Sequence, residues 1–167
     1  KDKKDEIFST DEIRNKKNLF PENKKILIIG SNFCKYDYRL SSEPNSSLIF
    51  NNSRYINNKK TLFEEITKSH DLIYKPHGVN NWFEDLIDIK KYKNFSIDKK
   101  NNLLDLASNS KLIIICHLST AFLETLSLNK PLILFLEKNF YNFTSIAKKD
   151  FENLKKIGIL HYNINSI

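Results

Sequence analysis

Short runs rich in apolar residues alternate along this chain with segments whose apolar positions recur at helical spacing. Such runs indicate strands that are buried on both faces of a sheet. They predict strands at residues 25–29, 71–75, 95–97, 112–116, 132–136 and 159–162. The helical spacing predicts helices at residues 59–69, 103–107, 121–128 and 145–157. Alternating strands and helices predict an α/β fold, with a mostly parallel sheet, helices on both faces and right-handed crossovers.

The segment from residue 112 to residue 136 predicts a strand, a helix and a second strand in direct succession. Its first strand ends at His117, and Ser119 and Thr120 stand where the helix begins. Ligands of open α/β sheets bind outside the carboxyl ends of the strands. Small hydroxyls beside the free N–H groups of a helix N-terminus suit a phosphate or another anion. A serine or threonine at this place is also what a helix N-cap requires, so both interpretations stay open.

Glu124 lies one turn into that helix, at a spacing that a capping box does not use. The positions three residues after Ser119 and Thr120 hold Phe122 and Leu123. We therefore expect Glu124 to accept hydrogen bonds from ligand hydroxyls such as a ribose diol. A solvated surface glutamate is the alternative.

His117 and His77 each follow the end of a predicted buried strand. They converge on one edge of the sheet if these strands are parallel neighbours. Lys75 adds a cation suited to a diphosphate. We expect the two histidines to contact a phosphate or a leaving group, and both are candidates for a catalytic role that the sequence does not assign. A hydrogen bond to the backbone is the alternative for each; His70 and His161 are interpreted as incidental.

A long polar stretch at residues 35–54 predicts a loop, and long loops inside compact domains are often functional. Arg39 in this stretch carries a planar fork that matches phosphate or carboxylate, although a salt bridge with Glu43 explains it equally well. Trp82 and Phe83 either stack on a base or sugar ring or belong to the core. Two boundary residues are also predicted: Asp98 as the N-cap of the helix at residues 103–107, and Gly158 as the residue after the last helix.

Charge and composition narrow the function classes. The 167 residues include 27 Lys and Arg against 20 Asp and Glu, a net charge of +7, and only three of the basic residues are arginines. This excess predicts a solvated, lysine-coated surface, or a basic face near anionic lipid or a nucleotide-linked donor. Scattered lysines without a recognised binding motif argue against nucleic acid as a partner.

Several chemistries have no support in the sequence. It holds no P-loop, GxGxxG, HExxH or nucleophile elbow, which argues against a kinase, a P-loop NTPase, a simple NAD dehydrogenase and a zincin. Cys34 and Cys116 lack metal-ligand spacing and are expected to be free thiols in a reducing cytoplasm. No apolar run is long enough for a transmembrane helix, and no signal peptide is recognisable. We expect neither a metal nor a cofactor.

Three segments carry a resemblance to a known family. Residues 110–131, with the order strand-H-x-S-T-x-x-x-E-T-L and a closing proline, look like the donor-binding half of GT-B glycosyltransferases, in particular a family of bacterial transferases of surface-carbohydrate biosynthesis. Residues 39–44 (RLSSEP), residues 75–77 (KPH) and residues 151–161 (FENLKKIGILH) are also similar to that family. A more distant similarity runs to CDP-glycerol glycerophosphotransferases of teichoic-acid synthesis. The resemblance covers roughly residues 26 to 161.

The resemblance implies two Rossmann-like domains around a cleft and catalysis without a metal. Residues 21–167 would be the C-terminal, donor nucleotide-binding domain of a longer protein, and residues 1–20 a polar lead-in or linker. Ser119 and Thr120 would hold the donor phosphates together with the helix N-terminus. Glu124 would contact the ribose or sugar, and the remaining donor-binding candidates are His77, Lys75, His117 and Arg39.

The implied reaction transfers a sugar from a nucleotide-sugar to a glycan or lipid-linked acceptor at the cell surface. The missing N-terminal domain would supply the acceptor site and the catalytic base, so we expect the fragment alone to be inactive. The implied location is cytoplasmic, with peripheral contact to the inner face of the plasma membrane. Two alternatives remain: a CDP-glycerol-type polyol-phosphate transferase domain, and a non-catalytic module that binds a nucleotide-sugar or a protein.

Overall fold

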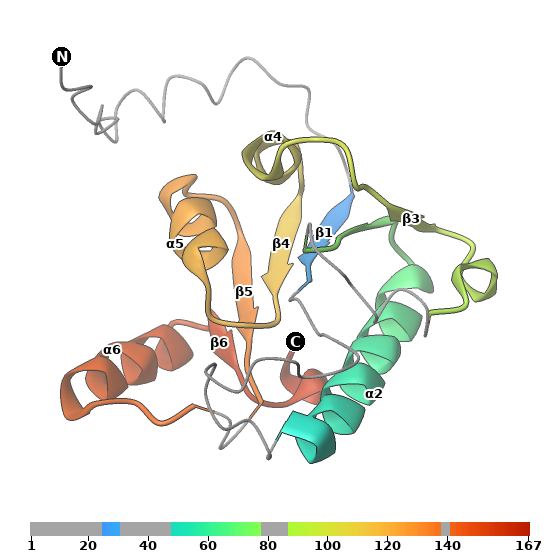
Figure 1. The fold of residues 1–167 in the computed structure, drawn as a ribbon. Coiled ribbons are helices and arrows are strands. Elements are labelled where there is room, and N and C mark those ends of the chain that lie inside the picture. The colour runs from blue at the N-terminus through green and yellow to red at the C-terminus, as the bar shows by residue number, and fades with distance from the viewer. Residues whose placement is uncertain (1–24, 31–47, 78–86, 138–140) are drawn as a thin grey trace, which may run out of the picture.

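The computed structural model describes residues 25–30, 48–77, 87–137 and 141–167, with the side chains of residues 48–53 left out. Strands and helices alternate along the chain (Figure 1). The elements are β1 (Ile26–Ile29), α2 (Leu48–Thr67), β2 (Leu72–Lys75), η3 (Ile89–Lys91), β3 (Phe95–Ile97), α4 (Leu103–Ser108), β4 (Leu112–Ile115), α5 (Thr120–Ser127), β5 (Leu132–Phe135), α6 (Ser145–Lys156), β6 (Leu160–His161) and η4 (Ile164–Ser166).

The six strands form one parallel sheet in the order β3-β2-β1-β4-β5-β6. The chain first builds outward from β1 through β2 to β3 and then returns to β4 on the other side of β1. Helix α2 covers one face of the sheet, and α4, α5 and α6 cover the other (Figure 1). This Rossmann-like arrangement confirms the predicted fold class.

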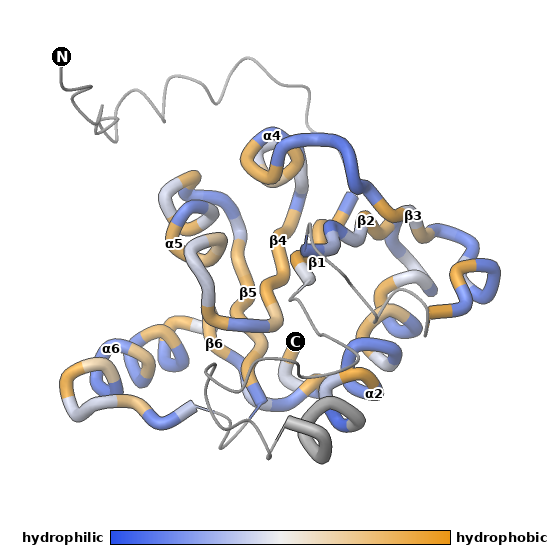
Figure 2. Tube along the Cα trace, in the orientation of Figure 1, coloured by the Kyte–Doolittle hydropathy of each residue, from blue (hydrophilic) through white to orange (hydrophobic). Residues whose placement is uncertain are grey.

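Two apolar layers hold the helices on the sheet. The strands are the most apolar part of the chain (Figure 2), as expected for strands buried on both faces. Successive residues of β4 alternate between the layers: Ile114 packs toward α2, whereas Ile113 and Ile115 pack toward α4 and α5. Phe63 from α2 and Phe122 from α5 are each buried in one of the two layers. The sheet is therefore a rigid platform whose ends present the loops.

Helix α2 is longer than its sequence pattern predicts. It begins at Leu48, so residues 48–54, which we expected to belong to a loop, are helical. The prediction is wrong there because asparagine, serine and lysine fill the exposed positions of the helix. Its buried positions nevertheless recur at helical spacing, in Tyr55, Ile56, Leu62 and Phe63.

Two predictions about the ends of helices have different outcomes. Asp98 is not the N-cap of α4: the Asn102 side chain accepts from the Leu104 N–H at 2.8 Å, whereas the Asp98 carboxylate accepts from the N–H of Lys100 and Asn101 in the preceding turn. Gly158 follows α6 with a φ of 77°, which confirms its predicted place after the helix. Among the residues that the structure describes, no helix is long and apolar enough to cross a membrane.

Candidate functional site

The carboxyl ends of the central strands meet at one edge of the sheet. Residue by residue, β1 pairs with both neighbours in register, so that Ile29 stands opposite Lys75 of β2 and Ile115 of β4. The chain order reverses between β1 and β4, and such a topological switch point is where open α/β sheets bind their ligands. The candidate site is therefore the carboxyl edge around β1 and β4.

His77 and His117 both lie at this edge, although their strands are not neighbours. We expected them to converge if their strands were parallel neighbours, but β1 lies between β2 and β4. The two imidazoles are nevertheless close enough for His77 to contribute to the pKa of His117. The condition attached to the prediction was wrong, because a pattern along the chain does not give the order of strands in a sheet.

Ser119 occupies the N-cap position of α5 without acting as a side-chain cap. Its backbone carbonyl accepts the N–H of Phe122 at 3.0 Å, but its hydroxyl makes no capping bond. The Ser119 Oγ atom is buried and has no hydrogen-bond partner among the described residues. Thr120, the next residue, is exposed. The N-terminus of α5 thus keeps N–H groups and an unused hydroxyl for an anion.

His117 follows β4 with its ring largely buried. Its Nδ1 atom is buried and has no hydrogen-bond partner within the described part of the chain. Burial, and then the positive charges of Lys59 and His77, lower the pKa of His117 to about 4. The imidazole is therefore neutral near pH 7. The hydroxyl of Tyr141, which precedes α6, accepts from the Leu118 N–H at 3.2 Å and anchors the chain beside His117.

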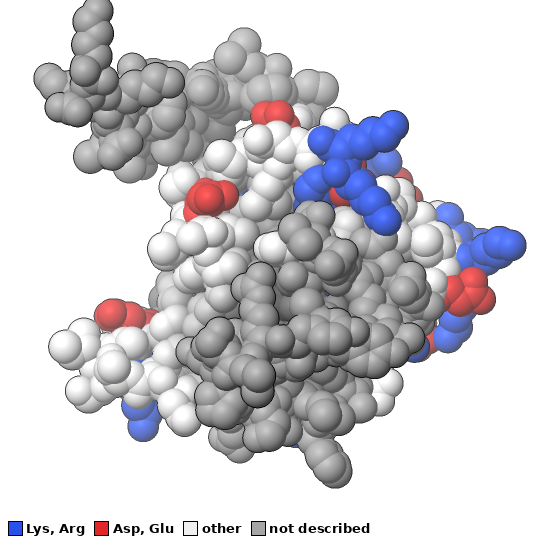
Figure 3. All heavy atoms as spheres, viewed as in Figure 1, with Lys and Arg blue, Asp and Glu red and all other residues white. Residues whose placement is uncertain are grey.

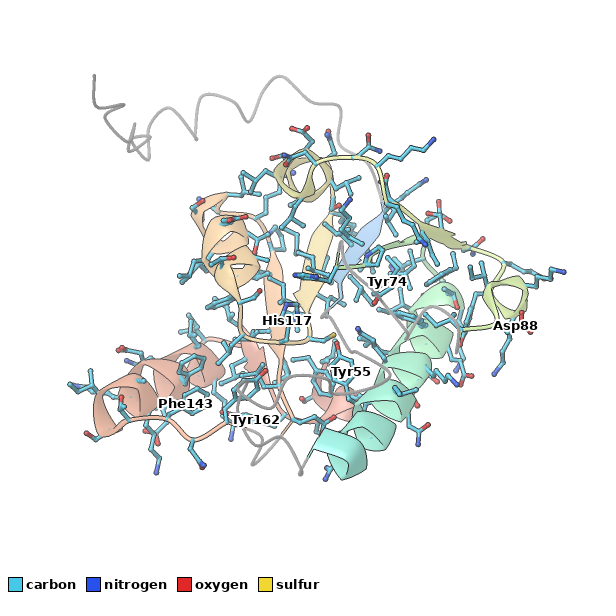
Figure 4. All side chains as sticks on the ribbon, in the orientation of Figure 1. Tyr55, Tyr74, Asp88, His117, Phe143 and Tyr162 are labelled. Carbon is cyan, nitrogen blue, oxygen red and sulfur yellow. The ribbon has the colours of Figure 1, made fainter. Side chains whose placement is uncertain are left out.

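Lys59 reaches the same edge from α2, and the sequence did not reveal it as a site residue. Its side chain is only 1% exposed. The ammonium Nζ donates a long hydrogen bond of 3.4 Å to the Tyr74 hydroxyl and lies 4.4 Å from the centre of the Tyr55 ring. Burial lowers the pKa of Lys59 to about 8, although the nearby Cys116 works in the opposite direction. Figure 4 labels Tyr55, Tyr74 and His117 around this position.

Gly30 leaves room for Tyr74 at the end of β1. A Cβ atom on residue 30 would meet the phenol of Tyr74, with the ring carbon Cε2 only 2.8 Å away. Gly30 also donates its N–H to the Lys75 carbonyl at 2.8 Å, so the backbone is held in place. Close approach, rather than an unusual backbone angle, explains this glycine.

A polar clamp connects α2 to the end of β5. The Glu137 carboxylate follows β5, and Arg54 Nε lies 3.0 Å from one of its oxygens. The Asn58 amide donates to the other oxygen. Glu137 is thereby paired on both sides, and the clamp holds this part of α2 over the carboxyl edge.

The remaining predicted site residues fall into three groups. The Lys75 ammonium is directed to the turn before α4, where it donates to the Asn101 carbonyl at 2.6 Å. His77 and Glu124 are exposed. Arg39 lies outside the described residues, and so do its alternative partner Glu43 and the aromatic pair Trp82 and Phe83.

The charged surface and the candidate site do not coincide. Exposed lysines lie along the β3 side of the molecule, in and after η3 and before α4, with acidic side chains among them (Figure 3). In the described part of the chain, no group of three or more His, Cys, Asp or Glu side chains is placed to hold a metal ion. The positive groups nearest the switch point are Lys59, which is buried, and the N-terminus of α5.

The strand order and the polar switch point define a Rossmann-like α/β domain of the kind that presents a ligand site at its carboxyl edge. The chain belongs to the LIC12162 family transferases, whose family model matches residues 6–167. No curated protein and no solved structure matches the chain. The family confirms the expected relation to transferases and favours an enzyme over a non-catalytic binding module.

Proposed function

We propose that this domain binds the nucleotide-sugar donor of a GT-B-type glycosyltransferase at the carboxyl edge of β1 and β4. In the proposed reaction, a hydroxyl of a cell-surface glycan or lipid-linked acceptor displaces the nucleotide from the sugar. The observation that carries the proposal is the unused polar pair at the switch point, the buried Ser119 Oγ and His117 Nδ1. Buried polar atoms nearly always have a partner, so a ligand is the simplest explanation for these two.

Each proposed contact follows from a position in the fold. Ser119, Thr120 and the N-terminus of α5 would hold the diphosphate, because hydroxyl and N–H donors there meet the positive end of the helix dipole. Glu124, one turn further and exposed, would accept from the ribose or the sugar. The developing charge of the leaving nucleotide would be stabilised by the same helix end.

His77 and Lys75 are proposed to face the diphosphate from the end of β2. His77 is exposed and free to approach a ligand. Lys75 would have to exchange its hydrogen bond to the Asn101 carbonyl for one to a phosphate oxygen. The acceptor site and the catalytic base are proposed to lie in another domain, and the protein to work at the inner face of the plasma membrane.

A binding screen tests the proposal. The domain would be mixed, without added metal, with UDP, GDP, CDP and CMP and with their sugar and glycerol conjugates, and its melting temperature recorded. A selective shift with a nucleotide-sugar supports the proposal, and a preference for CDP-glycerol would instead indicate the polyol-phosphate transferase. At about 100 times Kd, binding adds roughly 2.7 kcal/mol, which a thermal shift detects.

The matched variants are Ser119→Ala with Thr120→Ala, and Ser127→Ala as the control at the other end of α5. The Ser127 hydroxyl bonds only within the helix, to the Glu124 carbonyl at 2.7 Å. Loss of a hydrogen bond to a charged group is worth about 1.5–3 kcal/mol, so the double variant should bind roughly ten to a hundred times more weakly. Equal affinities of the double variant and the control would overturn the phosphate assignment.

A further inference from the structure

Lys59 is a buried charge that the fold does not need. In the described part of the chain it is the one charged residue that is buried; the other buried polar residues are Ser110 and Thr125. Their hydroxyls donate to helix carbonyls, Ser110 to Leu106 and Thr125 to Ala121. Burial of an ammonium opposes folding, and proteins keep such features at functional sites.

The surroundings of Lys59 orient its charge toward the end of β4. Its Nζ lies 4.4 Å from the Tyr55 ring centre and 5.1 Å from that of Tyr74, and both rings present a face that attracts a cation. The carboxylate at this edge, Glu137, is occupied by Arg54 and Asn58. The charge of Lys59 acts on Cys116 and on His117, the two residues that follow β4.

Several titratable and charged groups surround His117 at this edge. They come from α2, from the residue after β2, from the end of β4, from the residue after β5 and from the segment before α6: Lys59, Arg54, His77, Cys116, Glu137 and Tyr141. Burial raises the pKa of Cys116 to about 11, so that its thiol is uncharged. The charges acting directly on His117, those of Lys59 and His77, both oppose its protonation.

We infer that Lys59 is a positioning residue: its buried ammonium keeps the His117 imidazole uncharged, so that His117 hydrogen-bonds a hydroxyl of the donor's sugar or ribose instead of neutralising the donor's phosphates. A neutral imidazole offers one donor and one acceptor, which a hydroxyl matches. Phosphate binding then falls to Ser119, Thr120 and the N-terminus of α5. The inference rests on the proposed donor site and divides the work within it.

An NMR titration of the four histidines in the unliganded protein tests the first half of the inference. Wild type is compared with Lys59→Met, which keeps the length of the side chain without its charge. Lys60→Met is the matched control, since it removes the neighbouring charge on the same helix, and His117→Gln assigns the resonance. We expect the His117 midpoint near 4 in wild type. It should move upward in Lys59→Met and stay almost unchanged in Lys60→Met.

Two results of this titration overturn the inference. One is a wild-type His117 midpoint at the ordinary value of 6.5, which needs no variant and so does not depend on how Lys59→Met folds. The other is the same His117 midpoint in wild type and in Lys59→Met. Neither result bears on whether a nucleotide binds, so the titration fails separately from the proposed function.

A binding measurement tests the second half. The nucleotide-sugar that gives the largest thermal shift in the screen is titrated into wild type and His117→Gln from about pH 5.5 to about pH 8, the range in which an ordinary histidine changes its charge. We expect wild type to bind roughly tenfold more tightly, by the same factor at every pH. A factor that grows as the pH falls would show that His117 acts as a cation and would overturn the inference. Failure of every nucleotide conjugate to bind wild type would instead refute the proposed function.

Discussion

The buried ammonium of Lys59 makes a specific prediction about how the stability of this domain depends on pH. Burial lowers its pKa from 10.5 to about 8 in the folded protein. Between these two values the unfolded chain binds more protons than the folded one, so the contribution of Lys59 to stability rises with pH across this window. At one pKa unit per 1.36 kcal/mol, the charged form opposes folding by up to about 3 kcal/mol.

The expected change between pH 7 and pH 9 is small enough to need a matched variant. With a folded pKa of about 8, Lys59 alone adds about 1.3 kcal/mol over this interval. Cys116 opposes it, because burial raises the pKa of the thiol from 9 to about 11 and the unfolded chain ionises first. That term removes about 0.4 kcal/mol by pH 9. Wild type should therefore gain about 1 kcal/mol in its free energy of unfolding, whereas Lys59→Met should lose about 0.4 kcal/mol.

The assay is urea unfolding of wild type, Lys59→Met and Lys60→Met at pH 7, 8 and 9. Lys60→Met should follow wild type, because Lys60 is not buried. At pH 7, Lys59→Met should be the more stable protein by about 1–3 kcal/mol, since an apolar side chain replaces a buried charge. Parallel changes with pH in wild type and Lys59→Met would refute the reasoning, because the lysine could not then be a buried ammonium with a lowered pKa.

Two further substitutions test contacts at the same edge. Gly30→Ala should lower the free energy of unfolding by about 1–3 kcal/mol, because its Cβ would press on the Tyr74 ring; in a Tyr74→Leu background urea unfolding should show a smaller loss, and equal losses would contradict this contact. Glu124→Gln should leave stability within about 0.5 kcal/mol and weaken nucleotide-sugar binding roughly tenfold by calorimetry, with the exposed Glu152→Gln as control. Unchanged affinity would return Glu124 to the surface.

The parts of the fold that could be predicted from sequence depend on local order. Residues 112–136 form the predicted strand, helix and strand because a buried strand and a helix N-terminus each leave a local pattern of residues. The order of strands leaves no such pattern, since pairing between β1 and β4 joins residues far apart in the chain. The condition we placed on His77 and His117 was wrong for this reason.

Lys59 shows what the sequence contained and how it could have been found. Among many surface lysines its residue type carries no information. Its position does, because Tyr55, Ile56, Leu62 and Phe63 recur at helical spacing and Lys59 stands three or four residues from each of them. A lysine on the apolar stripe of a helix is the signal that was missed. The burial of its ammonium against Tyr74 still required the tertiary structure.

The separation of surface charge from buried charge bears on how an anionic donor is held. The exposed lysines of the β3 side act through water, and salt at physiological strength screens such charges beyond about 8 Å. The ammonium of Lys59 and the N-terminus of α5 lie at the switch point, where the former is almost fully buried and is screened far less. The net charge of +7 can thus speed the approach of a nucleotide, but it does not choose among nucleotides. Selection has to come from groups with fixed geometry, so a donor preference should persist at salt concentrations that abolish the contribution of the surface lysines.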